Sequence, residues 1–65
     1  MRYVVSIYDC FDGGLRSKLI TANDWRDAIY QMDEDKSSFL PKNGTIQTLQ
    51  DIAADQDWFF TVTEV

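Results

Sequence analysis

Carboxylates are the side chains of this sequence most able to do chemistry, and many of them fall in two short runs. Asp33-Glu34-Asp35 and Asp55-Gln56-Asp57 could each offer oxygen ligands to a hard cation. Neither run has the ligand spacing or the central glycine of a calcium-binding loop. An acid and base pair also needs a deep cleft, which a chain of 65 residues rarely forms. We therefore expect solvated acidic turns, with no metal and no cofactor.

Candidate nucleophiles are present but lack a partner to activate them. The sequence contains no histidine, the commonest general base and proton shuttle. Cys10, the only cysteine, and the serines therefore have no imidazole to deprotonate them. Asp12-Gly13-Gly14 is not followed by the Lys-Ser/Thr of a phosphate-binding loop, so it indicates a hairpin turn. These absences predict a protein that is not an enzyme.

The charge balance favours some partners over others. Eleven acidic residues against six basic ones give a net charge of -5. This excess repels phosphate backbones and anionic membranes, so direct nucleic-acid binding is disfavoured. It attracts a basic protein partner and speeds the encounter with it. The alternative is that the acid only keeps a small protein soluble.

Size and composition predict a single domain, residues 1–65, with a packed core, since 45% of the residues are hydrophobic. One unpaired cysteine suits a reducing compartment. The apolar stretch near the N-terminus is shorter than the core of a signal peptide, and no segment is long enough to span a bilayer. We expect a cytoplasmic protein that does not enter a membrane. So small a domain is only marginally stable, which favours a partner subunit and hence a homodimer.

The first part of the chain has the pattern of a β-hairpin. Residues 3–8 are rich in β-branched and aromatic side chains, and the glycines of residues 12–14 supply a turn. In residues 15–21, apolar or small side chains alternate with Arg16 and Lys18. This alternation is typical of a half-buried strand.

An amphipathic helix is predicted for residues 23–32. Its apolar stripe has the i, i+3, i+4, i+7 spacing of a helix face and consists of Trp25, Ala28, Ile29 and Met32. Asn23 is predicted as the N-cap, with a capping box that begins at Thr21 as the alternative.

The rest of the chain contains a loop, an ambiguous segment and a strand. Pro41 and Asn43-Gly44 mark the loop. In residues 45–54, helical spacing of the apolar side chains and an alanine pair favour a helix, whereas threonines after Asn-Gly favour a strand. We predict the helix and keep the strand as the alternative. Residues 58–65 predict a strand at or near the centre of the sheet.

These elements predict an α+β fold, a small two-layer domain with an antiparallel sheet of three or four strands and one or two helices on one face. The expected core consists of Val5, Leu19, Trp25, Ile29, Met32, Phe60 and Val62. The other sheet face stays open and is expected to carry Arg16, Lys18, Phe59, Thr61, Thr63 and one or two tyrosines of the first strand.

Three stretches carry a resemblance to a known kind of protein. They are VVSIYDCFDGG (residues 4–14), ITANDWRDAI (residues 20–29) and WFFTVTEV (residues 58–65). In style they resemble the small proteins encoded by bacteriophages and prophages. Some of those proteins, of similar size and acidity, inhibit host defence, among them anti-CRISPR proteins and DNA mimics. The resemblance implies such an inhibitor, and it implies no particular catalytic or binding residue.

Acid after the first helix is the leading candidate for a binding site. Asp33, Glu34 and Asp35, together with Asp27, are expected to form one negative patch. Acid at a helix C-terminus opposes the helix dipole, a cost that a role in binding would explain. Carboxylates spaced in this way imitate duplex phosphates and fit a basic groove. We therefore predict a non-enzymatic protein-binding module, an inhibitor that engages a basic nucleic-acid-binding protein.

Two alternatives use the open sheet face instead. In one, Phe59 and its aromatic neighbours drive self-association or docking onto another protein. In the other, Phe59 and Tyr8 stack on the bases of a single strand of RNA or DNA. Such sheets sit in a basic field, whereas only Arg16 and Lys18 cluster here, so nucleic-acid binding is the least favoured.

Overall fold

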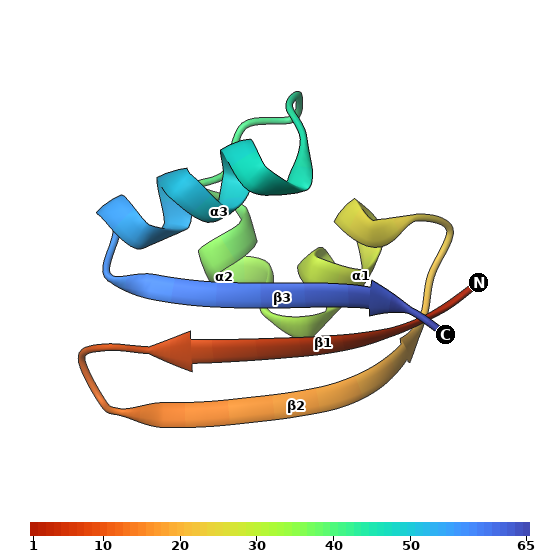
Figure 1. Ribbon diagram of the computed structural model, residues 1–65, viewed down its shortest axis with the longest axis horizontal. Helices are drawn as coiled ribbons and strands as arrows, with labels where there is room; N and C mark the ends of the chain where they lie inside the picture. The colour runs from red at the N-terminus through yellow and green to blue at the C-terminus, as the bar shows by residue number, and fades with distance from the viewer.

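A three-stranded antiparallel sheet forms one layer of the protein, and three helices form the other (Figure 1). The computed structural model describes residues 1–65. Its elements in chain order are β1 (Arg2–Asp9), β2 (Gly14–Thr21), α1 (Trp25–Met32), α2 (Glu34–Ser37), α3 (Ile46–Asp55) and β3 (Trp58–Glu64). The predicted two-layer α+β fold is therefore confirmed. The segment from residue 46 to 55 is a helix, and its alternative as a strand is wrong.

The strand order is β2-β1-β3, so β1 is the central strand. The last strand is expected at or near the centre of the sheet; β3 lies beside the central strand, as an edge strand that pairs with β1 alone. An apolar strand is tolerated at this edge because α3 packs along it. The amide Nε2 of Gln50 donates a hydrogen bond to the outward carbonyl of Phe60 at 3.0 Å. The two chain ends lie close together, joined by a hydrogen bond from the Val65 N–H to the Arg2 carbonyl.

A tight turn joins β1 to β2, as the glycines predict. Gly13 adopts a φ of 67°, which glycine reaches without steric cost. Its N–H donates to the Asp9 carbonyl at 2.8 Å, and the Gly14 N–H donates to Oδ1 of Asp12 at 2.7 Å. A second turn leads from α3 into β3 through Asp57, a non-glycine residue with a φ of 66°. The Asp57 carbonyl accepts from the Cys10 N–H at 3.0 Å, which holds the two turns together.

The N-cap of helix α1 lies one residue later than predicted. Asp24, and not Asn23, is the N-cap, because Oδ1 of Asp24 accepts from the Asp27 N–H at 2.8 Å. Oδ2 of Asp27 in turn accepts from the Asn23 N–H at 3.2 Å, so both acids satisfy free donors at the helix start. None of the three helices is long and apolar enough to cross a membrane.

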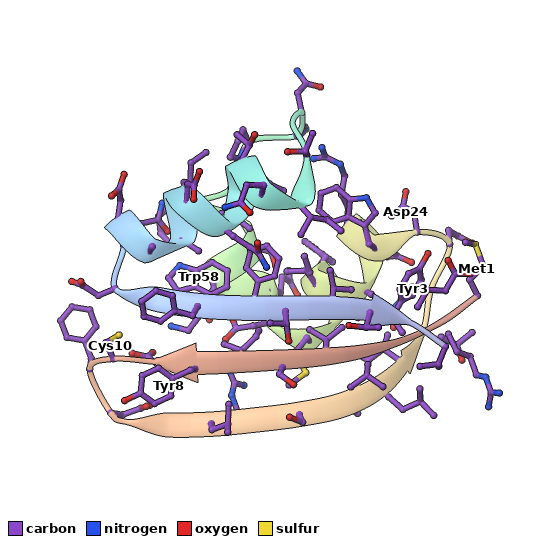
Figure 2. The ribbon with its side chains drawn as sticks, in the orientation of Figure 1. Met1, Tyr3, Tyr8, Cys10, Asp24 and Trp58 are labelled. Atoms are coloured by element: carbon purple, nitrogen blue, oxygen red, sulfur yellow. The ribbon has the colours of Figure 1, made fainter.

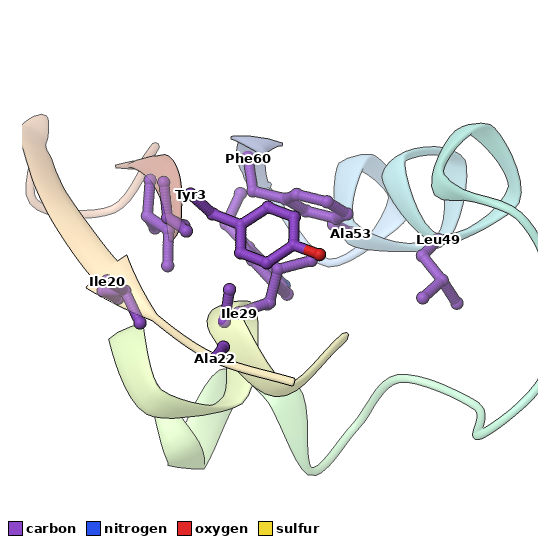
Figure 3. Close-up of a cluster of buried hydrophobic side chains, with 11 residues drawn as sticks. Tyr3, Ile20, Ala22, Ile29, Leu49, Ala53 and Phe60 are labelled. Atoms are coloured by element: carbon purple, nitrogen blue, oxygen red, sulfur yellow. The ribbon is translucent and has the colours of Figure 1, made fainter. Parts of the chain in front are cut away.

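The core lies between the sheet and the helices (Figure 3). Its buried side chains are Tyr3, Val5, Ile7, Ile20, Ala22, Ala28, Ile29, Leu49, Ala53, Trp58 and Phe60. Of the predicted core residues, Val5, Ile29 and Phe60 are buried, and Trp25, Met32 and Val62 pack against them partly exposed. Leu19 is the exception, since it is exposed.

Strand β2 turns its faces the opposite way from the prediction. The register places Val5 opposite Lys18 and Ile7 opposite Arg16, and residues directly opposite share a face. Because Val5 and Ile7 face the helices, Arg16 and Lys18 do so as well, and Leu19 lies on the open side. Both cations are exposed, so they stay hydrated beside the core.

We predict that Ile29→Ala lowers the free energy of unfolding by about 2–5 kcal/mol, because it leaves a cavity where a fully packed side chain was. Ile29 is 2% exposed, whereas Phe39 is 72% exposed. Phe39→Ala is thus a matched control that removes a larger side chain and should cost within about 0.5 kcal/mol. Urea denaturation followed by tryptophan fluorescence measures both. Equal midpoints for the two variants would contradict this packing of α1 on the sheet.

Candidate interaction surfaces

The acidic run after α1 belongs to a second helix and not to the end of the first. Asp33 ends α1, where its N–H donates a hydrogen bond to the Ile29 carbonyl. Its side chain also caps α2, because Oδ1 accepts from the Lys36 N–H at 3.0 Å. Glu34 and Asp35 then fall in the first turn of α2, where the helix dipole favours acid. The expected conflict with the dipole is therefore wrong. Sequence reasoning missed α2 because it is four residues long.

Asp33 also has a cationic partner. Its Oδ2 lies 2.7 Å from Nη2 of Arg16, which reaches over from β2. Burial on its own would raise the pKa of Asp33, but the Lys36 N–H and the Arg16 guanidinium outweigh it and leave the pKa of Asp33 lowered. At neutral pH the Asp33 charge is therefore neutralised locally.

A second ion pair ties α2 to the central strand. Nζ of Lys36 lies 2.6 Å from Oδ2 of Asp9 and 5.9 Å from the centre of the Trp58 ring. The hydrogen bond from Lys36, with another from the Phe11 N–H, lowers the pKa of Asp9. Asp33 and Asp9 together anchor α2 beside the sheet.

The four acids predicted as one patch have different surroundings. Asp27, six residues before Asp33 and thus about 9 Å away along the α1 axis, accepts from the Asn23 N–H and from Nε2 of Gln31. Asp33 is paired with Arg16, and Glu34 raises the pKa of Tyr30 through a hydrogen bond and its charge. Asp35 has no cationic partner.

One hollow on the helical side has a volume of about 340 Å³ and lies between α1, α3 and the loop that joins α2 to α3. The guanidinium of Arg26 stands at its rim. It donates to the carbonyls of Pro41 and Gly44 and lies 4.6 Å from the centre of the Trp25 ring. These contacts hold the loop against α1, so Arg26 has a structural role there.

The sheet face that the helices leave uncovered is the second candidate surface, and we call it the open face. Cross-strand pairing and alternation place Arg2 and Thr21 at one end of it. Next to this end follow nine further side chains: Val4, Ser6, Tyr8, Leu15, Ser17, Leu19, Phe59, Thr61 and Thr63. They form three rows across the strands. The Tyr8 row is Leu15, Tyr8 and Phe59; the Ser6 row is Ser17, Ser6 and Thr61; the Val4 row is Leu19, Val4 and Thr63.

Apolar side chains dominate the two outer rows. Phe59 is 50% exposed, Leu19 53% and Leu15 70%. The rings of Tyr8 and Phe59 stack with centroids 6.5 Å apart, and Figure 2 shows Tyr8 over the strands on the side away from the helices. In the Ser6 row between them, the hydroxyls of Ser6 and Ser17 lie 2.7 Å apart. Phe59 therefore lies on the face where the sequence predicts it.

The open face is almost free of charge. Both acids that lie within strands, Asp9 and Glu64, point to the helical side, and Arg2 at the end of β1 is the only charged side chain on the open side. The predicted cations of this face, Arg16 and Lys18, lie on the other side. A chain with a net charge of -5 thus presents one surface that has no acid and a single cation, Arg2, at its end.

Sequence reasoning missed Leu15 and Leu19 as surface residues. Alternation divides a strand into two faces but does not indicate which one is buried. Because leucine is apolar, we predicted that the face with Leu15 and Leu19 is buried, and it is the exposed one. The available signal was the pairing across the hairpin. A four-residue turn from Cys10 to Gly13 sets Leu19 opposite Val4, and Val4 alternates with the more strongly buried Val5 and Ile7.

Comparisons of the chain with protein families, with curated proteins and with solved structures find no match. The function has to be inferred from the acidic helical side and the open face alone.

We predict that Asp33→Ala lowers the free energy of unfolding by about 0.5–2 kcal/mol at neutral pH, because it removes a helix cap. Asp33→Asn keeps a capping oxygen, so it should cost less. The folded pKa of Asp33 is depressed, so its contribution is present above the unfolded pKa of about 3.9 and is lost as the pH falls through the lower folded pKa.

Urea titrations between neutral and acidic pH measure these effects. Both variants should lose stability less steeply than the parent on the acid side of this range. An unchanged slope in both variants would show that the ion pair with Arg16 does not contribute in solution.

Proposed function

We propose that this protein is a non-enzymatic protein-binding module and that the open face is its contact surface. One observation carries the proposal. An acidic chain keeps every carboxylate off a sheet face that exposes Tyr8, Leu15, Leu19 and Phe59. Charge is the usual means by which a small protein keeps a surface in water, so its absence here favours a face that is covered in use.

The makeup of the open face suits a protein partner. Aromatic side chains dominate the energetics of interfaces, and the stacked Tyr8 and Phe59 lose little side-chain entropy when they are covered. The Ser6 row adds hydroxyls that can both donate and accept hydrogen bonds. Small-molecule sites are concave, whereas this surface is the outer side of a sheet.

The same face argues against a nucleic-acid partner. Proteins that stack bases on a sheet surround the aromatic side chains with a positively charged groove. Arg16 and Lys18 point away from Phe59, and only Arg2 remains on its side. The field around a bound strand would be negative, since the net charge is -5.

A second candidate function, an acidic inhibitor of a basic protein, has one observation in its favour. Of eleven acidic residues, Asp9 and Asp33 are in ion pairs, which leaves nine without one. Among the nine, Glu34 and Asp35 lie exposed and adjacent in the first turn of α2. This surplus supports electrostatic attraction to a basic surface, the role that the resemblance to phage inhibitors implies.

Capture of partners on the immobilised protein separates the two functions. We expect a protein partner that stays bound in about 1 M salt, where charges are screened within about 3 Å, because buried apolar area is little affected by salt. Phe59→Thr should release it, while the strand keeps a residue that favours β structure.

The matched control is the double variant Glu34→Gln, Asp35→Asn, which should bind as the parent does. A partner that is lost in salt and lost with this double variant, yet held by Phe59→Thr, would instead establish the acidic surface as the site.

A further inference from the structure

We infer that the open face pairs with the open face of a second copy of this chain. The inference rests on the proposed function, because it requires that face to be the contact surface, and it names the partner. The result would be a four-layer homodimer, helices, sheet, sheet and helices, with the two sheets packed about 10 Å apart.

The rows of the open face are complementary to themselves under a twofold axis. With the axis along the Ser6 row, the Tyr8 row of one copy covers the Val4 row of the other. Leu15 then faces Leu19 and Tyr8 faces Val4, whereas Phe59 faces Thr63, whose methyl group it can contact. The Ser6 row meets its own copy. Hydroxyls both donate and accept, so Ser6, Ser17 and Thr61 can face their own copies through bridging waters between the two sheets.

Charge decides which surface two copies can share. Each copy carries -5, so contacts through the acidic helical side bring like charges together. The open face avoids this cost because it contains no acid. Association of two copies is therefore least opposed through the open face.

Edge pairing of β2 with its own copy is the main alternative for a dimer. Antiparallel pairing centred on Ser17 would set Arg16 of one copy directly opposite Lys18 of the other. Like charges directly opposite destabilise a strand pair, and cations on an edge strand commonly prevent such pairing. Face-to-face packing leaves both cations at the rim, in water.

The size of the face sets the strength of the dimer. Eight residues of strand span about 26 Å, and three strands with their side chains span about 15 Å, which gives about 400 Å² for each copy in flat projection. Two copies thus bury about 800 Å² in flat projection, which is less than the roughly 1,200–2,000 Å² of stable specific interfaces and in the range of weak, transient ones. We therefore expect a dissociation constant in the micromolar range.

Sedimentation of the full chain from low micromolar to high micromolar concentration tests the inference. The parent should change from monomer to dimer, and salt should leave the dimer intact or tighten it as repulsion is screened. Leu19→Lys adds a charge to the open face and should weaken dimerisation about tenfold or more. Gln47→Lys adds the same charge on the exposed side of α3 and should dimerise at least as well as the parent.

Cross-linking locates the surface independently. The background is Cys10→Ser, because Cys10 is free and exposed. Ser6→Cys in that background should cross-link to its copy with a bismaleimide that spans about 10 Å, the distance between packed sheets. Gln47→Cys, on the helical side, should not.

Each outcome has a defined consequence. A parent that stays monomeric, or a dimer that Leu19→Lys does not weaken, overturns the second copy as the occupant. If capture from lysate still requires Phe59 in that case, the open face binds a different protein and the proposed function stands. If capture is also indifferent to Phe59, the proposed function falls as well.

Discussion

The burial of Val5 and Ile7 is the constraint on which the rest of this structure depends. Both side chains are fully buried, and β1, which carries them, is hydrogen-bonded on both sides. Side chains directly opposite each other share a face, so the orientation of β1 dictates the orientation of β2 and β3. Burying two aliphatic side chains therefore selects which side chains of all three strands remain on the open face.

Two ion pairs lie between the helical side of the sheet and α2. Arg16 and Lys18 share the helical side of the sheet, and Arg16 joins Asp33 at the start of α2. Lys36 from the same short helix joins Asp9 at the end of β1. Exposed ion pairs contribute little stability each, but both of these join α2 to the sheet, so they orient it. Charge gathers on the helical side, and the open face keeps only Arg2.

This separation gives the protein two surfaces of opposite physical character. The helical side carries acid that repels another copy of the chain and attracts a basic protein. The open face has no acid and is partly aromatic, with Tyr8 stacked on Phe59. The core of so small a domain is thin, with 11 of 65 residues buried, and a partner on the open face would shield the outer side of the same sheet.

The sequence by itself determined the local elements, because their signals lie within a few residues. Helical spacing was sufficient for α1 and α3, the glycines for the first turn, and strand-favouring residues for β3 with Phe59 on its outer face. Only the tertiary structure decided which face of β2 is buried. Alternation is symmetric between the two faces, and the choice came from pairing with β1. The ion pair that joins the start of α2 to β2 was likewise non-local, since Asp33 and Arg16 are seventeen residues apart in the sequence. The Asp33 cap of α2 is local, but a helix of four residues is too short to show a periodic pattern.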